Sequence, residues 1–176
     1  IEHREGTPDT YAVLMGNQEM ADVVQPVKGF QSLFCAPATI NLSGAEVDLV
    51  PMMVREYRLA RALHPYLEVH KEKHGQALDF VFIDCPPSLG LLTINAFVAA
   101  DELMVPIQCE YYALEGVNQL LRTLGLVNSS LNATLKIETV LLTMADNRTI
   151  LSNEVAADVR NSFGDVVLET VIPVSY

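Results

Sequence analysis

The sequence predicts an α/β protein with a mostly parallel, doubly wound sheet that carries helices on both faces. Through the second half of the chain, apolar β-branched segments alternate with amphipathic segments of helical length, which is typical of βαβ units. In addition, an unbroken apolar run at 80–83 ends on Asp84. Such a run is typical of a strand buried on both faces of a parallel sheet.

The first half of the chain predicts shorter elements. Thr7 and Pro8 indicate the start of a helix, with Thr7 as N-cap, and Gly16 indicates its end. The elements expected next are a short helix over 19–24, a strand over 31–36, a loop, and a charged surface helix within 46–73. Pro65 should break or kink that surface helix, because proline lacks the N–H that an interior helical residue donates.

After Asp84 the alternation becomes regular. The expected elements are a helix over 91–100, a strand over 102–108, a helix over 114–127, a strand over 137–144, a helix over 151–163 and a strand over 166–172. The crossovers between parallel strands should be right-handed. No linker or repeat interrupts the pattern, so we expect residues 1–176 to form one domain.

Composition and charge exclude several classes of protein. Half of the 176 residues are hydrophobic, so the chain can bury a substantial core. No apolar run approaches the roughly 18 residues of a membrane span, and the polar start is unlike a signal peptide, so a cytoplasmic location is expected. The net charge of −11 opposes nonspecific DNA binding and anionic membranes for this stretch alone. Cys35, Cys85 and Cys109 lack metal-ligand spacing and are expected to be reduced thiols in or near the core.

The segment that follows the apolar run at 80–83 has the composition of a phosphate and magnesium site. Asp84 falls at the expected carboxyl end of a parallel strand, where open sheets bind ligands and where a carboxylate can hold Mg²⁺ directly or through water. Pro86 and Pro87 force a stiff turn that can register a γ-phosphate. The alternative is that Asp84 merely ends a strand and caps the next helix, and that the prolines only break the regular structure between them.

Two further groups of residues are expected at the same edge of the sheet. Asp146 and Arg148 could approach a nucleotide base or, for Arg148, a DNA phosphate. An ordinary turn, in which Asp146 bonds to its own backbone, explains them equally well. Glu110, Tyr111 and Tyr112 could form a dimer-facing or switch-coupled surface, although simple packing of the strand-to-helix turn is the preferred explanation.

Several runs resemble the ParA/Soj group of chromosome- and plasmid-partitioning ATPases, relatives of the division-site ATPase MinD. The most specific are FVFIDCPPSLGLLTINAF at 80–97 and VPIQCEYYALEGVNQLL at 105–121, and further matches lie at 35–50, 54–63, 140–160 and 169–173. The resemblance implies a deviant P-loop NTPase fold that binds ATP and Mg²⁺. It also implies a homodimer around the nucleotide, nonspecific DNA binding by that dimer, and ATP hydrolysis stimulated by a ParB-type DNA-binding activator.

The resemblance also assigns residues. Asp84 matches the Walker B aspartate, which holds magnesium through water, and the second switch near the γ-phosphate matches Pro86, Pro87, Ser88 and Gly90. Pro173 and Ser175 match positions that contact the adenine end of the nucleotide, although Val174 replaces the arginine that the family has between them.

The sequence departs from the family by containing no Gly-rich loop with a phosphate-binding lysine. We therefore expect an incomplete P-loop domain, truncated at both ends, with no assignable catalytic residue and no ATP hydrolysis by itself. In the family such a protein is cytoplasmic and nucleoid-associated. The alternatives are a noncatalytic ParA-like interaction module, another cargo-positioning member of the ParA/MinD family, or an unrelated doubly wound domain that binds a different ligand.

Overall fold

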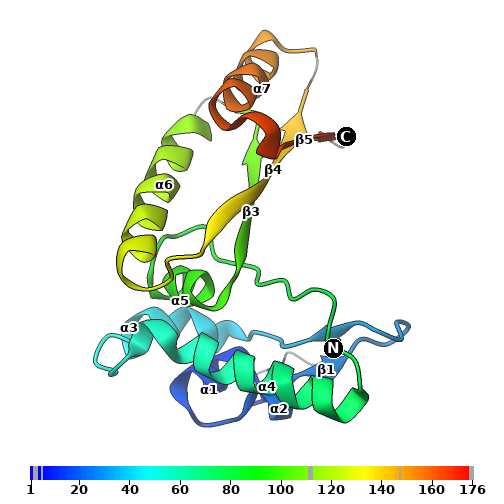
Figure 1. Ribbon diagram of the computed structural model, residues 1–176, viewed down its shortest axis with the longest axis vertical. Helices are drawn as coiled ribbons and strands as arrows, with labels where there is room; N and C mark the ends of the chain where they lie inside the picture. The colour runs from blue at the N-terminus through cyan, green and yellow to red at the C-terminus, as the bar shows by residue number, and fades with distance from the viewer. Residues whose placement is uncertain (2–3, 5, 111–112, 147, 175–176) are drawn as a thin grey trace. The chain divides into compact units, whose positions relative to one another are not determined.

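The computed structural model describes residues 1, 4, 6–110, 113–146 and 148–174. It forms two compact units, Ile1–Ala99 and Ala100–Tyr176. Figure 1 shows the course of the chain through these helices and strands.

The first unit is mainly helical. Its elements are α1 (Thr10–Met15), α2 (Met20–Val23), β1 (Gln25–Pro26), β2 (Phe34–Cys35), α3 (Ala45–Asp48), α4 (Arg58–His74) and α5 (Leu91–Ala99), with 3-10 turns at Ile40–Gly44 and Arg55–Tyr57. Helix α4 packs against α1, α2 and α5. The buried side chains at the centre include Leu14, Val23 and Leu49, which expose 2% of their surface or less.

The start of α1 differs from the sequence prediction. Asp9, not Thr7, is the N-cap, and its carboxylate accepts a hydrogen bond from Ala12 N at 2.9 Å. Thr39 donates a second hydrogen bond to this buried carboxylate. The Thr7 hydroxyl instead donates to Arg4 O at 2.6 Å, so it stabilises the preceding turn. The predicted end at Gly16 is confirmed, with a left-handed φ of 79°.

The predicted surface helix within 46–73 is two helices rather than one. Val54 adopts a φ of 55°, in the left-handed region that ends a right-handed helix, and it separates α3 from α4. Pro65 lies inside α4 and does not end it. Proline removes one backbone hydrogen bond there, and the buried positions Leu59 and Leu63 hold the helix against the rest of the unit.

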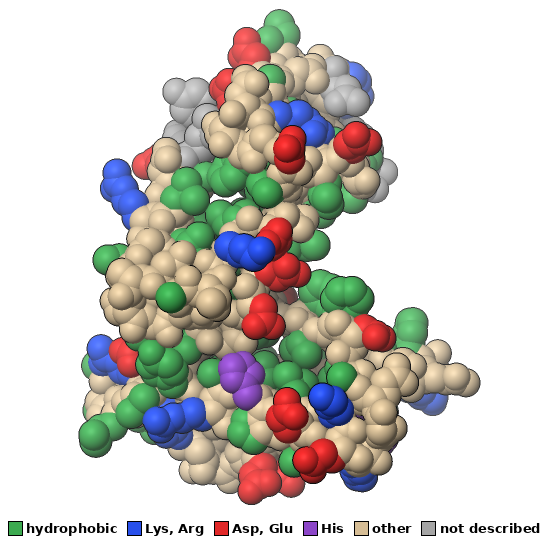
Figure 2. All heavy atoms as spheres, in the orientation of Figure 1, with side chains coloured by type: hydrophobic (Ala, Val, Ile, Leu, Met, Phe, Trp, Pro, Cys, Tyr) green, Lys and Arg blue, Asp and Glu red, His purple; other side chains and the backbone are tan. Residues whose placement is uncertain are grey.

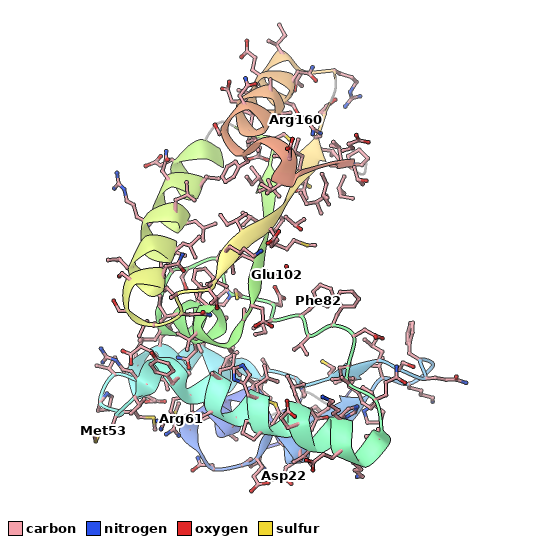
Figure 3. All side chains as sticks on the ribbon, viewed as in Figure 1. Asp22, Met53, Arg61, Phe82, Glu102 and Arg160 are labelled. Carbon is pink, nitrogen blue, oxygen red and sulfur yellow. The ribbon has the colours of Figure 1, made fainter. Side chains whose placement is uncertain are left out.

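The predicted strand at 80–83 is absent. This segment is irregular, and Phe80 and Phe82 are 77% and 80% exposed. Their rings stack on each other with centroids 6.1 Å apart, and Figure 3 shows Phe82 projecting from the chain. The physical reason is that a strand forms only when a neighbour accepts its hydrogen bonds, and no strand in the described residues pairs with this segment.

The predicted strand at 31–36 is only partly present. Phe34 and Cys35 form β2, which pairs antiparallel with β1 in a separate two-stranded ladder. It belongs to the first unit, and the described parallel sheet does not include it. A short ladder of this kind orders the chain between α2 and α3 and leaves Phe34 exposed.

The second unit contains the parallel sheet. Its elements are β3 (Glu102–Gln108), α6 (Ala113–Ser130), β4 (Lys136–Ala145), α7 (Ile150–Phe163), a 3-10 turn (Gly164–Val166) and β5 (Val167–Pro173). The strand order is β3-β4-β5, and both pairs are parallel, as predicted. The predicted helix and strand boundaries after 90 agree with these elements within a few residues.

The core of the second unit lies between the sheet and its helices. A register shift near Leu103 aligns Val105 with Val140 and Ile107 with Leu142, so these four side chains share one face. Val117 of α6 and Val155 and Val159 of α7 belong to the same buried cluster. Successive side chains of a strand point to opposite faces of the sheet. This packing therefore fixes which face each residue at the carboxyl ends of the strands occupies.

Candidate functional site

The Asp84–Gly90 segment leads directly into α5. Asp84, Pro86, Pro87 and Ser88 are exposed, whereas Gly90 is half-buried. Thr93 in the first turn of α5 donates a hydrogen bond to Ser88 O at 2.6 Å. The carboxylate of Asp84 is therefore open to solvent, and the segment becomes ordered against the helix only at its end.

The start of α5 is capped by Glu46 of α3. The Glu46 carboxylate accepts hydrogen bonds from Leu91 N at 2.7 Å and from Leu92 N at 3.2 Å. A Cβ atom at Gly90 would lie 2.7 Å from Glu46 Cδ, so a larger residue there would displace the carboxylate from this position. Gly90 thus has an observed structural role, while its assignment to the second switch remains a prediction.

The role of Glu46 is not evident from the sequence pattern around it. One feature of the sequence does indicate that α5 needs a cap from elsewhere. Leu89-Gly90-Leu91, at the start of the helix, offers no Ser, Thr, Asp or Asn as an N-cap. A helix without a local cap needs acceptors from another part of the chain for its first N–H groups. The sequence could therefore indicate that a cap was needed, but not which residue supplied it.

Asn95 connects α5 to the start of α4. Its side-chain oxygen accepts from Leu59 N at 3.1 Å, and its amide nitrogen donates to Arg55 O at 2.8 Å and to Leu91 O at 2.9 Å. The side chain is 1% exposed. Glu46 and Asn95 together hold α5 at two successive turns.

Cys85 lies next to the candidate magnesium ligand, and its surroundings disfavour the thiolate form. The residue is exposed, which corrects the expectation of a core or near-core thiol, yet its sulfur donates to Ile83 O at 3.5 Å. Local desolvation of this sulfur, together with the charge of Asp84, raises the pKa of the Cys85 thiol. Thiolate is the reactive form, so the site disfavours chemistry at Cys85 at neutral pH. Cys109 is buried as expected, and Cys35 is partly buried.

In the second unit the structure brings two predicted positions together. Ala145 at the end of β4 pairs with Pro173 at the end of β5, and Val174 N donates to Ala145 O at 3.1 Å. Asp146 follows Ala145 directly, so Asp146 and Pro173 lie at the carboxyl ends of neighbouring strands. Ser175 lies outside the described residues, as do Asn147, Tyr111 and Tyr112.

Asp146 and Arg148 form the turn that the sequence offered as one of two explanations. Asp146 Oδ1 accepts from Arg148 N at 3.0 Å and from Arg148 Nε at 2.8 Å. The second carboxylate oxygen accepts from the Arg148 guanidinium at 2.8 Å. The Arg148 side chain is 72% exposed despite this pairing. Contact of either residue with a base or with DNA remains a prediction.

Asp84 fits a hydrated magnesium ion only as a single ligand. Its exposed carboxylate is an oxygen donor of the kind that Mg²⁺ takes, directly or through water. In the described ranges, no group of three or more His, Cys, Asp or Glu side chains could hold a metal. The N–H groups at the start of α5 are occupied by Glu46. Other donors must therefore complete any nucleotide and magnesium site.

None of the helices described for this chain is long and apolar enough to cross a bilayer.

The parallel sheet and its flanking helices define an α/β fold of the P-loop NTPase class. A crystal structure of cobyrinic acid a,c-diamide synthase from Mycobacterium smegmatis with bound ADP and magnesium is 37% identical, with a TM-score of 0.80 over 97% of this chain and 66% of that one. A structure of the McdA(D38A)–ATP complex from Cyanothece has a TM-score of 0.80 at 19% identity, over 94% of this chain and 62% of that one, and shows the fold alone.

Sequence comparison identifies the family. A family described as an AAA domain matches residues 1–137. The sporulation initiation inhibitor protein Soj of Bacillus subtilis is 47% identical over 98% of this chain and 65% of its own length. The chromosome partitioning protein ParA of Myxococcus xanthus is 43% identical over 95% of this chain and 56% of its own length. The chain therefore belongs to the ParA/Soj family of partitioning ATPases, and it spans less than two thirds of the length of these relatives.

Proposed function

We propose that this chain is the central part of an ATP-dependent switch for chromosome or plasmid partitioning, and that its two units together form one ATPase domain. The observation that carries the proposal is the DCPPSLG segment, which leads into α5 with Asp84 exposed, in a chain 47% identical to Soj. A solvent-exposed carboxylate that precedes a capped helix is suited to a magnesium ion that arrives with a nucleotide.

Each predicted residue has a role in this proposal. Asp84 holds magnesium through water, and Pro86, Pro87, Ser88 and Gly90 form the switch that responds to the γ-phosphate. Pro173 and Ser175 contact the base, while Asp146 and Arg148 contact the base or DNA. Magnesium and ATP supply the charge and the transferable phosphoryl group when bound, and the chain's own residues orient them.

DNA binding, dimerisation and stimulation by a ParB-type activator are proposed for the complete protein, in the cytoplasm and on the nucleoid. This chain has a net charge of −11, and Lys and Arg side chains lie scattered among acidic ones on the face drawn in Figure 2. Phosphate contacts need clustered cations, so the net negative charge opposes DNA binding by this chain alone. Without a Gly-rich lysine loop, we also propose that the isolated chain does not hydrolyse ATP.

The test is calorimetric titration of Mg-ATP into this chain and into the complete gene product. We expect binding by the complete product only. In that product, Asp84→Ala should abolish magnesium-dependent hydrolysis, whereas Asp79→Ala, which removes another exposed carboxylate five residues earlier, should not. Equal binding by the short chain, or retained turnover in Asp84→Ala, would refute the assigned roles.

A noncatalytic interaction module is the second candidate. It is favoured by one observation, namely that the helix N-terminus next to the DCPPSLG segment is already occupied by Glu46 and is closed to a phosphate. If neither the short chain nor the complete gene product binds Mg-ATP, this second candidate replaces the first.

A further inference from the structure

We propose that Glu46 is a positioning residue for the switch segment, because it fixes the point at which residues 84–90 join α5. This inference rests on the proposed ATPase function for its consequence in turnover. The contact itself belongs to the first unit and can be tested without nucleotide.

The contact is specific in geometry. The Glu46 carboxylate accepts hydrogen bonds from two successive backbone N–H groups, at 2.7 and 3.2 Å, which lie 45 and 46 residues away in sequence. A negative charge at a helix N-terminus also interacts favourably with the helix dipole. Gly90 lets the carboxylate approach, since a Cβ atom there would overlap it. The glycine and the glutamate thus form one matched pair.

The contact with Glu46 lies at the boundary between helix α5, which is held by hydrogen bonds, and the exposed segment that precedes it. Leu91 and Leu92 are held by Glu46, and Asn95 holds the next turn of α5 through Leu59 N and Arg55 O. Residues 84–88 are exposed and irregular. Thr93 also donates to Ser88 O, so a rearrangement of residues 84–87 around a ligand should turn within Ser88–Gly90, where α5 and Glu46 hold the chain.

Helix α3 contacts both the start of α5, through Glu46, and helix α1, through Asp48. Asp48, one half-turn after Glu46, accepts a hydrogen bond from the Tyr11 hydroxyl at 2.9 Å. This bond raises the pKa of Tyr11. Asp48 therefore provides a matched control, since it is a second carboxylate on the same short helix that contacts α1 instead of α5.

The first test measures amide hydrogen exchange in the isolated chain by NMR. Loss of a helix cap typically opens the first turn by about fivefold, so Glu46→Ala should speed exchange at Leu91 and Leu92 by about that factor. Glu46→Asp should restore part of the protection, and Asp48→Ala should leave these two amides unchanged. Unchanged exchange in Glu46→Ala would overturn the proposal.

A double-mutant cycle with Gly90 tests the pairing independently. Gly90→Ala should lower the urea midpoint of unfolding in the parent chain, because the new methyl group overlaps the carboxylate. In a Glu46→Ala background the same change should cost little or nothing, since the overlap is gone. An equal cost in both backgrounds would show that the two residues do not act as a pair.

The functional test uses the complete gene product. If Glu46 positions the switch, Glu46→Ala should lower kcat by about tenfold while KM for ATP stays within about twofold, and Asp48→Ala should change neither. An unchanged kcat would refute the role in turnover. If the parent protein does not hydrolyse ATP at all, the proposed function fails, whereas the exchange and unfolding measurements still decide whether Glu46 fixes the segment.

Discussion

Asn95 allows a quantitative test of how α5 is held in place. The side chain is 1% exposed and satisfies Leu59 N and Arg55 O, neither of which belongs to its own helix. Asn95→Ala removes both partners. Each buried polar group left unpaired costs about 1–3 kcal/mol, so the loss of two partners should lower the free energy of unfolding by about 2–6 kcal/mol.

The assay is urea unfolding followed by far-ultraviolet circular dichroism, since the chain contains no tryptophan. The matched control is Asn41→Ala, which truncates an exposed asparagine in the same unit and should change stability by less than about 0.5 kcal/mol. A loss in Asn95→Ala no larger than in this control would refute the conclusion that the side chain holds α5 to α4.

Asn95→Asp adds a signature in pH. It keeps the acceptor for Leu59 N, but it places a carboxylate oxygen against two carbonyl oxygens, those of Arg55 and Leu91. Burial and this repulsion should raise the pKa of the new carboxyl above its unfolded value of about 4. Its destabilising effect should therefore be smallest at acid pH, where the group is protonated, and grow as pH rises through the folded pKa. A pH-independent loss would contradict this account.

Three further predictions concern single positions. Because the pKa of the Cys85 thiol is raised, iodoacetamide should alkylate it more slowly at pH 7 than in the urea-unfolded chain, as read by mass spectrometry of the peptide; equal rates would contradict the shift. Gly16→Ala should destabilise by more than about 1 kcal/mol in thermal unfolding, since φ is 79° and a Cβ would lie 2.7 Å from the Arg58 guanidinium. Gly125→Ala, in the middle of α6 with open space around it, should instead stabilise by about 0.5–1 kcal/mol, and a loss there would contradict the stated geometry.

Much of the second unit could be predicted from local sequence. The predicted strand at 102–108 coincides with β3, and α7 differs from its predicted helix by one residue at its start. These segments carry their own periodicity and pair with neighbours that follow soon after in the chain. Parallel pairing of β3 with β4 and of β4 with β5 then follows from helical connections of ordinary length.

The first unit was less predictable because its boundaries depend on distant partners. The run at 80–83 has the composition of a buried strand, yet it is exposed where no described strand pairs with it. The N-cap of α1 is Asp9 rather than Thr7, with support from Thr39, which lies 30 residues away. Propensity ranks candidate caps, but tertiary contacts select among them.

The sequence by itself determined the α/β class, the ParA/Soj membership and the identity of Asp84 as the candidate magnesium ligand, because periodicity and short motifs are local properties of the chain. Only the tertiary structure decided that Glu46 caps α5, that Asn95 joins α5 to α4, and that Val174 N donates to Ala145 O where the ends of β4 and β5 meet. Each of these depends on which donor comes within about 3 Å of which acceptor. That distance is set by packing of the whole unit, which no local pattern encodes.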